Sequence, residues 1–291
     1  MTFAFGHRSH IERQVRQIAG QQISRAMDDV SGAEADFDGT VHGLRRRCKK
    51  LRGLVQLIRP RFRQWKRNDR LFRDAARRLS GSRDAAVLVE TFDDVVNGED
   101  EIGLLQAEEI RQWLQGRVVE PLDAGQRASF FGDFVDLFEE ARRSASRWSL
   151  AGNGFAQIGD GLEQGYRRMR QGMELARRSG NPDALHAWRK ETKYHWHHVS
   201  LLQATAPDVL GPRRKALAGL GDLLGDHHNL TVLAETLETS PYGDVATAPI
   251  ARRQASLAGD AFALGRQLAA EKPRALRERF EKYWSLLPEK D

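Results

Sequence analysis

The residue types that could do chemistry lie in two stretches with the same spacing. One histidine and three cations recur without a gap at an offset of 144 residues: His42, Arg45, Arg46 and Lys49 in the first copy, and His186, Arg189, Lys190 and Lys193 in the second. Arginine binds phosphate oxygens bidentately, lysine acts as a point charge, and a neighbouring histidine can donate a hydrogen bond or become a cation. The repeated pattern therefore predicts a binding site for a polyanion.

Helical geometry places each set of four side chains on one face. At about 100° per residue, the first copy forms a polar stripe with Arg52 at its edge, beside a core-facing row that contains Leu44 and Cys48. In the second copy the stripe extends to His197. Stacked like charges destabilise an isolated helix by roughly a few tenths of a kcal/mol per pair, which favours a ligand that neutralises them. A solvated basic face without a ligand is the alternative interpretation.

Positive charge is concentrated in one part of the chain. The 291 residues carry a formal net charge of +6, with a sequence pI of about 9.7. Residues 41–83 contain 16 Lys and Arg against two Asp, whereas residues 84–110 contain nine acidic residues and no Lys or Arg. Such segregation is typical of a binding surface for an anionic partner.

Cysteine usage and hydropathy predict the compartment. A single cysteine excludes an intrachain disulfide and favours a reducing environment. The first residues lack the apolar run of a signal peptide, and no stretch approaches the roughly 18 apolar residues of a membrane span. We therefore expect a cytoplasmic protein with no membrane partner.

Apolar residues spaced by three and four dominate the chain and predict an all-α fold of about a dozen helices. Asn181 and Pro182 predict the N-cap and first residue of a helix. The glycine-containing stretch 149–154 divides the chain into an N-terminal half, 1–148, and a C-terminal half, 149–291, each expected to be a helical bundle. Turn-forming residues predict helix breaks near 31–38, 80–83, 97–100, 121–125, 149–154, 179–182, 205–212, 225–229 and 239–246.

The repeated segments resemble the CHAD domain, the conserved histidine α-helical domain. Residues 41–60 are similar to its first-half pattern V-H-x-x-R-V-x-x-R-R-L-R, which closes on R-P, and residues 185–193 are similar to its second-half pattern L-H-x-L-R-K-x-x-K. In the family each pattern is followed by a short L-G-x-x-(R/N)-D-x-x-V element, which residues 79–87 and 224–232 resemble. The four elements occur in the family's order and span nearly the whole chain.

The resemblance implies two similar helical bundles related by a pseudo-twofold axis, with basic residues of both repeats lining a central groove or channel. It also implies inorganic polyphosphate as the ligand and, in some members, association with polyphosphate granules. Tyr194 and Trp196 stand where the family prefers Arg or Lys, so we expect the first repeat to carry more of the ligand. The residues expected to bind polyphosphate are His42, Arg45, Arg46, Lys49, Arg52, Arg59, Arg83, His186, Arg189, Lys190, Lys193 and His197.

The remaining histidines do not predict a metal site. A zinc ion needs three or four converging ligands, and His195, His197 and His198 point to different sides of one helix. We expect structural roles for these histidines and for His227-His228, and a helix N-cap or bracing role for Asn229. Cys48 is expected to be a buried small apolar residue.

Enzyme signatures are missing from the sequence. There is no P-loop, no dinucleotide-binding glycine pattern and no paired-histidine zinc-protease motif, so we expect non-catalytic binding without a cofactor. A nucleic-acid-binding protein is the alternative, which the absence of aromatic residues for base stacking in residues 42–56 disfavours. A phosphate-metabolising enzyme that uses the histidines is the second alternative.

Overall fold

The computed structural model describes residues 3–31, 36–79, 84–97, 103–117 and 123–290. Within these ranges the chain forms 11 α-helices and two short 3₁₀ turns and contains no β-strand, which confirms the predicted all-α class. The helices are α1 (Ile11–Ser31), α2 (Phe37–Ile58), α3 (Trp65–Arg78), α4 (Asp84–Val96), α5 (Leu104–Gln115), α6 (Ala124–Ala145), α7 (Ala156–Ser179), α8 (Pro182–Leu202), α9 (Pro207–Glu238), α10 (Gly243–Leu268) and α11 (Pro273–Trp284).

The sequence repeat is also visible in the order of the elements. The basic helix α2 ends in the 3₁₀ turn Arg59–Arg61, and the second basic helix α8 ends in the 3₁₀ turn Gln203–Thr205, at the same offset. Each basic helix begins at a side-chain cap: the Asp36 carboxylate accepts from the Gly39 amide, and the Asn181 side chain accepts from the Asp183 amide. The predicted cap at Asn181 and the first helical position at Pro182 are confirmed.

The predicted break at 80–83 lies outside the described residues, and the one at 205–212 is too long, because α9 begins at Pro207 and continues through Pro212. The predicted break at 225–229 is wrong. Helix α9 continues through residues 225–229 without interruption. Leu217, Leu220 and Leu224 before this stretch and Leu230 after it are all buried, so one apolar face spans it and outweighs the weak helix preference of Gly225. Asn229 therefore lies inside a helix and is not an N-cap.

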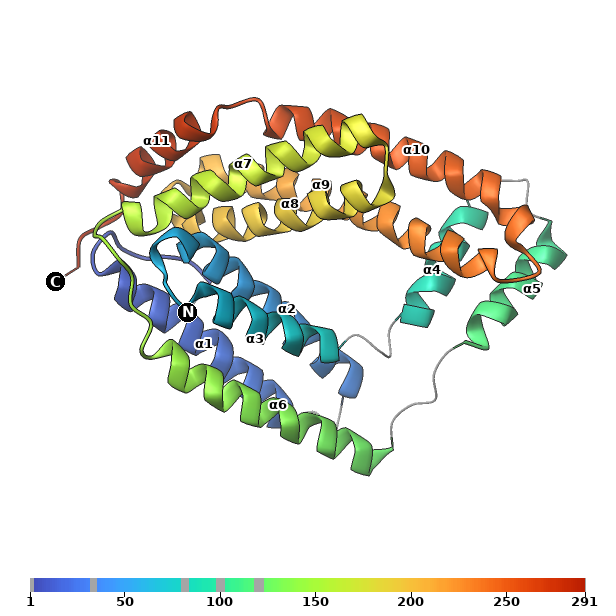
Figure 1. Ribbon diagram of the computed structural model, residues 1–291, viewed down its shortest axis with the longest axis horizontal. Coiled ribbons are helices and arrows are strands. Elements are labelled where there is room, and N and C mark those ends of the chain that lie inside the picture. Colours follow the sequence, from blue (N-terminus) through green and yellow to red (C-terminus); the bar gives the residue numbers. More distant parts are fainter. Residues whose placement is uncertain (1–2, 32–35, 80–83, 98–102, 118–122, 291) are drawn as a thin grey trace.

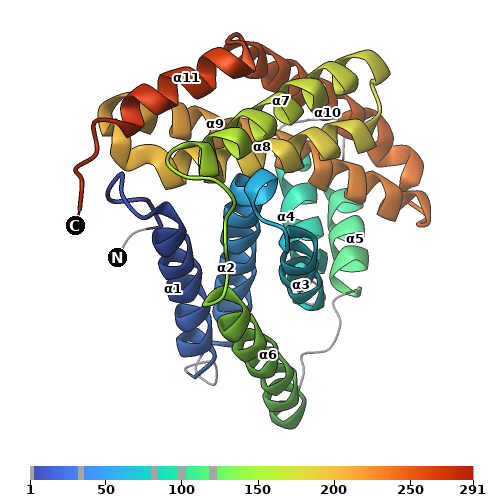
Figure 2. The same ribbon diagram turned by 60° about the vertical axis from the view of Figure 1, so that its left-hand side comes forward.

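Two groups of helices share the main hydrophobic core. Helices α1, α2, α3 and α6 form one group, and α7, α8, α9, α10 and α11 form the other (Figure 1). Figure 2 shows α2 ending against α7 and α8, and these three helices are in contact. Gly161 of α7 makes this approach possible, because a Cβ there would overlap the backbone carbonyl of Leu57 in α2.

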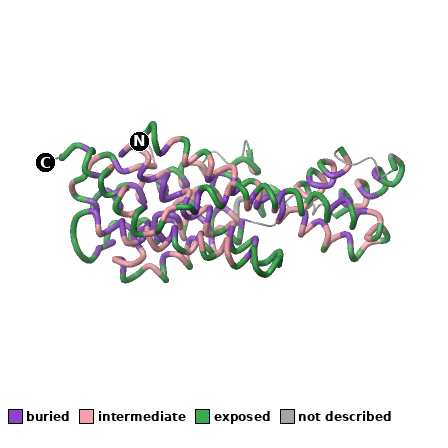
Figure 3. The backbone as a smooth tube through the Cα atoms, turned by 90° about the horizontal axis from the view of Figure 1, so that it is seen from above, coloured by how far each residue is buried: buried purple, intermediate pink, exposed green. Residues whose placement is uncertain are grey.

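A second, smaller core crosses the predicted division of the chain. Helices α4 and α5 belong to the N-terminal half, yet they share a hydrophobic cluster with the last part of α9 and the first part of α10, in which α4 contacts α5, α9 and α10. Phe92 and Ile110 from the first half and Leu233 from the second are fully buried in this cluster. Figure 3 shows the two buried regions at opposite ends of the long axis. The packing therefore does not separate into residues 1–148 and 149–291.

Helix α8 occupies the centre and packs against α2, α7 and α9. Glycines on its neighbours let it approach closely. A Cβ at Gly53 of α2 would lie 2.6 Å from the Cβ of His197, and a Cβ at Gly165 of α7 would lie 2.6 Å from Cε1 of His198. This tight fit fixes the rotation of α8 and so decides which of its polar residues reach the surface. In the described part of the chain, no helix is both long enough and apolar enough to cross a membrane.

Candidate functional site

A cavity of about 730 Å³ lies between α2, α4, α8 and α9. It brings together side chains from both copies of the basic pattern. Helix α4 closes one side with two apolar residues, and α9 contributes a histidine, an asparagine and a valine. The lining residues are His42, Arg45, Arg46, Lys49, Val87, Leu88, His186, Arg189, His228, Asn229 and Val232.

The α2 wall carries three of the cavity's cations, Arg45, Arg46 and Lys49, together with His42. The residues His42, Arg46 and Lys49 are exposed, whereas Arg45 is half-buried. An Arg45 guanidinium nitrogen donates to the carbonyl oxygen of Leu79, at the end of α3, over 3.4 Å. Arg46 forms no hydrogen bond or ion pair with any residue that the structure describes, so its guanidinium is available to an anion.

The α8 wall carries a cation that is partly removed from water. Arg189 lies across Gly225 of α9, and its Nε is buried without a hydrogen-bond acceptor among the described residues. Burial lowers the pKa of Arg189, and the carboxylates of Asp222 and Asp226 oppose that effect. A buried donor of a charged group without an acceptor is costly, and a phosphate oxygen in the cavity would supply the acceptor.

Two histidine rings meet beside this arginine. The ring centroids of His186 and His228 are 4.0 Å apart. Burial lowers the pKa of His228 to about 4, with further lowering by His186 and Arg189. Burial, Arg189 and Lys190 also lower the pKa of His186. Both imidazoles are therefore neutral at pH 7, and each can donate one hydrogen bond to a phosphate oxygen.

Sequence reasoning missed His228 and Asn229 as cavity residues, assigning them structural or capping roles. The periodicity of α9 contains a signal that could have found them. Gly225, His228, Asn229 and Val232 recur at spacings of three and four, which puts them on one face of an uninterrupted helix. Because a helix break was predicted at 225–229, these residues were not recognised as lying on one helical face.

The two lysines of the second repeat do not line the cavity. Lys193 lies across Gly221, and its ammonium forms an ion pair with the Asp222 carboxylate at 3.0 Å. Lys190 is exposed on α8 outside the cavity lining. Of the predicted second-repeat residues, the structure therefore brings His186 and Arg189 to the α2 cations.

Arg52 and Arg59 are also directed away from the cavity. The Arg52 guanidinium pairs with the Asp69 carboxylate of α3 through Nε at 3.1 Å, and it lies 5.5 Å from the ring centroid of Tyr194. The Arg59 guanidinium lies 4.0 Å from the ring centroid of Trp65, the first residue of α3. Arg52 therefore contacts α3 from α2, and Arg59 contacts it from the 3₁₀ turn that follows α2.

His197 and Arg83 complete the predicted set. The His197 side chain of α8 is buried against Gly53 of α2. This burial and the positive charges of nearby lysines lower the pKa of His197 to about 3. His197 is buried and does not line the cavity, so it lies outside the candidate site. Arg83 lies outside the described residues.

Metal binding and thiol chemistry find no support in the described side chains. No group of three or more His, Cys, Asp or Glu within those ranges is placed to hold a metal ion. Cys48 is fully buried, and burial raises its pKa to about 12, which confirms the predicted apolar role.

Comparison with known proteins identifies a family. The family model of the CHAD domain matches residues 12–238, which run from the start of α1 to the end of α9. No curated protein and no solved structure gave a match to the chain.

Proposed function

The chain belongs to the CHAD domain family, and we propose that it binds inorganic polyphosphate without altering it chemically. The observation that carries this proposal is the cavity in which cations from α2 and α8 meet, although their segments are 144 residues apart in the sequence. Polyphosphate is a ligand of some CHAD domains. Its chain of anionic oxygens matches a cavity that carries four cations and, among the described residues that line it, no carboxylate.

The physical basis is charge neutralisation. Arg45, Arg46 and Lys49 stand within two turns of one helix, and a bound anion reduces the repulsion between their charges. Arginine and lysine contacts to phosphate oxygens are charge-assisted hydrogen bonds, and binding a polyanion releases its condensed counterions. We therefore expect an affinity that falls steeply as salt concentration rises.

Family membership supports two further proposals. The two repeats are related by a pseudo-twofold axis, which agrees with the matching 3₁₀ turns after α2 and α8. The protein acts in the cytoplasm and associates with polyphosphate granules. Microscopy of a fluorescent fusion in cells that accumulate polyphosphate, with and without the cavity variant described next, tests the second proposal.

Binding of long-chain polyphosphate to purified protein tests the main proposal. Replacing Arg46 and Lys49 with Ala removes two exposed cavity cations and should weaken binding by roughly 1.5–3 kcal/mol for each charge-assisted hydrogen bond to phosphate that is removed. The matched control replaces Arg266 of α10 and Lys282 of α11, which are also exposed and lie outside the cavity. Equal losses of affinity in the two double variants would mean that net charge alone attracts the polyanion.

Nucleic acid is the alternative ligand. The described residues that line the cavity include no Phe, Tyr or Trp on which a base could stack, which favours a phosphate chain without bases. Competition between long-chain polyphosphate and single-stranded RNA or DNA at fixed salt separates the two ligands. A preference for nucleic acid would reject polyphosphate as the principal ligand.

Catalysis is tested separately. Incubating the protein with polyphosphate and divalent metal ions should leave the chain length unchanged and should not phosphorylate His42, His186 or His228. Chain shortening or a phosphohistidine would instead establish an enzyme that uses the cavity histidines.

A further inference from the structure

The outer face of α3 carries a second row of cations that leads away from the cavity. Lys66, Arg70, Arg73 and Arg77 are spaced by four, three and four residues, which stacks them along one side of the helix. All four are exposed. The side chains that α3 buries, Asn68, Phe72 and Ala75, point the opposite way, so this row faces solvent.

Few internal partners neutralise this row. Arg73 pairs with its neighbour Asp74 at 3.1 Å. Lys66, Arg70 and Arg77 form no hydrogen bond or ion pair with the residues that the structure describes. Like charges stacked at these spacings destabilise the helix, and an anion along the row would remove that repulsion.

The C-terminal end of the row lies near the cavity. Arg45, which lines the cavity, donates to the carbonyl of Leu79 directly after the last turn of α3. Arg77 stands two residues before that carbonyl, and Lys66 lies 11 residues further back, about 16 Å along the helix. A phosphate chain that leaves the cavity at Arg45 would therefore meet Arg77 first and could continue along α3.

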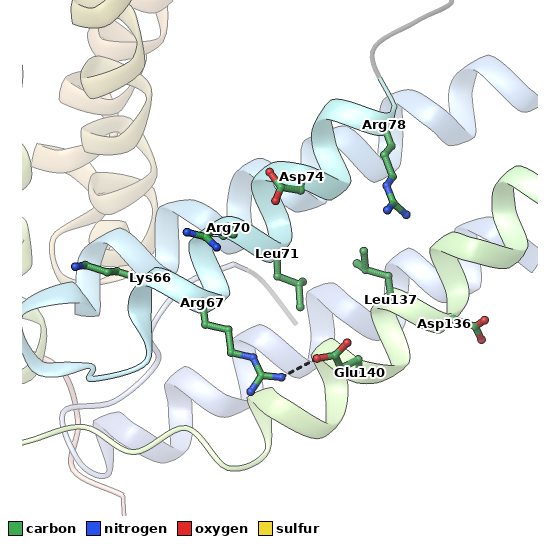
Figure 4. Close-up of a pocket in the computed structure, with 9 residues that line it drawn as sticks. All are labelled: Lys66, Arg67, Arg70, Leu71, Asp74, Arg78, Asp136, Leu137 and Glu140. Carbon is green, nitrogen blue, oxygen red and sulfur yellow. Dashed lines mark hydrogen bonds and ion pairs between the residues drawn. The ribbon is translucent and has the colours of Figure 1, made fainter.

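The groove between α3 and α6 is a poorer path for an anion. Asp136 and Glu140 form its α6 wall, and Arg67 already pairs with Glu140 at 2.8 Å (Figure 4). Figure 4 also shows Arg78 directed toward α6, whereas the ends of Lys66 and Arg70, which line the groove on its α3 side, point away from α6. Carboxylates on one wall disfavour a polyanion inside the groove, so the outer face of α3 is the better surface.

From this arrangement we infer that the Lys66–Arg70–Arg73–Arg77 row is an extension of the binding site that holds the part of a long polyphosphate chain outside the cavity. The inference rests on the proposed function and adds a chain-length dependence to it. Chains too short to leave the cavity bind through the α2 and α8 cations alone, whereas longer chains also bind along α3.

The experiment compares tripolyphosphate with long-chain polyphosphate. A triple variant, Lys66→Gln, Arg70→Gln and Arg77→Gln, removes the unpaired cations of the row. The matched control, Arg13→Gln, Arg266→Gln and Lys282→Gln, removes three exposed cations from α1, α10 and α11. Dissociation constants are measured at limiting protein and at several salt concentrations, and thermal unfolding verifies that each variant folds.

We expect the α3 variant to bind long chains roughly 3- to 100-fold more weakly, as the removal of three exposed ionic interactions would give. Its salt dependence should flatten for long chains only, and tripolyphosphate binding should stay within about twofold of the parent, as the removal of three surface charges outside the cavity would allow. An unchanged long-chain affinity overturns the inference, as does an equal decrease in affinity for both ligands or an equal decrease in the control.

The cavity variant distinguishes this inference from the proposed function. Arg46→Ala with Lys49→Ala should weaken binding of both ligands. If that variant changes neither ligand while the α3 variant weakens both, polyphosphate binds along α3 and not in the cavity, and the inference of an extension is overturned. If the parent protein binds neither ligand, the proposed function fails. If the α3 variant loses affinity for single-stranded RNA but keeps its affinity for long-chain polyphosphate, the row serves nucleic acid and the inference is overturned.

Discussion

Arg189 of α8 lies across Gly225 of α9, where a Cβ atom would stand 3.2 Å from both its Nε and one terminal nitrogen. Gly221, one turn earlier, accommodates Lys193 in the same way. The two glycines allow two basic side chains of α8 to lie flat against α9. Arg189 reaches the cavity by this route, whereas Lys193 meets Asp222.

Replacing Gly225 with Ala should weaken polyphosphate binding without destabilising the fold. The added Cβ pushes the Arg189 guanidinium by a few tenths of an ångström, because only a flexible side chain stands in its way. The binding free energy for polyphosphate should weaken by roughly 1 kcal/mol, which is part of the contribution of one charge-assisted hydrogen bond. The free energy of unfolding should hold or rise by up to about 1 kcal/mol, since Ala favours a helix interior.

Gly259→Ala in α10 is the matched control for this substitution. A Cβ at Gly259 meets no atom within 4 Å, and the residue is exposed. The Gly259→Ala variant should gain a similar free energy of unfolding, measured by urea unfolding. Its polyphosphate affinity, measured by calorimetric titration, should be unchanged. If Gly225→Ala binds polyphosphate as tightly as its parent, the position of Arg189 across α9 does not matter for the ligand.

Arg52 should matter for stability more than for binding. Its guanidinium and the Asp69 carboxylate are only 18% and 14% exposed, and Arg52→Gln would leave that carboxylate with Gln56 as its remaining side-chain partner. We expect a loss of about 1–3 kcal/mol in urea unfolding, because a half-buried charge loses its partner. Polyphosphate affinity should change less than in the Arg46 and Lys49 variant.

An exposed pair that involves α3 provides the comparison. Arg67 and Glu140 are 70% and 52% exposed, and Arg67→Gln should cost no more than about 1 kcal/mol. A larger decrease in affinity from Arg52→Gln than from the cavity substitutions would place Arg52 in the binding site after all.

Polyphosphate binding should take up protons in mild acid. The pKa of His228 is lowered to about 4 and that of His186 is lowered as well, both by burial and neighbouring cations. Bound phosphate adds negative charge beside both rings and raises these pKa values. Affinity should therefore increase as pH falls below about 6.5. Calorimetry at pH 6 in buffers of different ionisation enthalpy measures the uptake, which His186→Gln with His228→Gln should reduce.

Acid should destabilise the free protein through the buried histidines of α8. Burial lowers the pKa values of His197 and His198 to about 3, whereas in the unfolded chain they titrate near 6.5. Their contribution to stability is complete above about pH 6.5 and is lost as pH falls from there toward 3. In that window each histidine should lower the free energy of unfolding by roughly 1.4 kcal/mol for every unit that the pH falls. Urea unfolding at pH 7.5 and pH 5 measures the effect, and equal stabilities would contradict it.

The fold class and most of the helix ends were predictable because they depend on local spacing. Apolar residues three and four apart, Asn181 as a cap and Pro182 as a first residue all act within one or two turns. The break at 225–229 was not predictable in this way, since the buried leucines of α9 override the local preference of Gly225.

Part of the candidate site was likewise predictable from local spacing, and part was not. Periodicity alone placed His42, Arg45, Arg46 and Lys49 on one helical face, and the structure puts all four in one cavity. The same reasoning could not see that Asp69 would engage Arg52 or that Asp222 would engage Lys193, because these partners come from other helices.

By itself, the sequence determined that two helices each present a histidine and cations on one face, because the 3.6-residue period is a local property of the backbone. The tertiary structure decided which of these side chains share a cavity. That choice depends on how closely helices approach: Gly53 and Gly165 fix the rotation of α8, which buries His197 and directs His186 and Arg189 toward α2. Helix packing brings together segments that are distant in the sequence, and residue spacing within one segment does not determine those contacts.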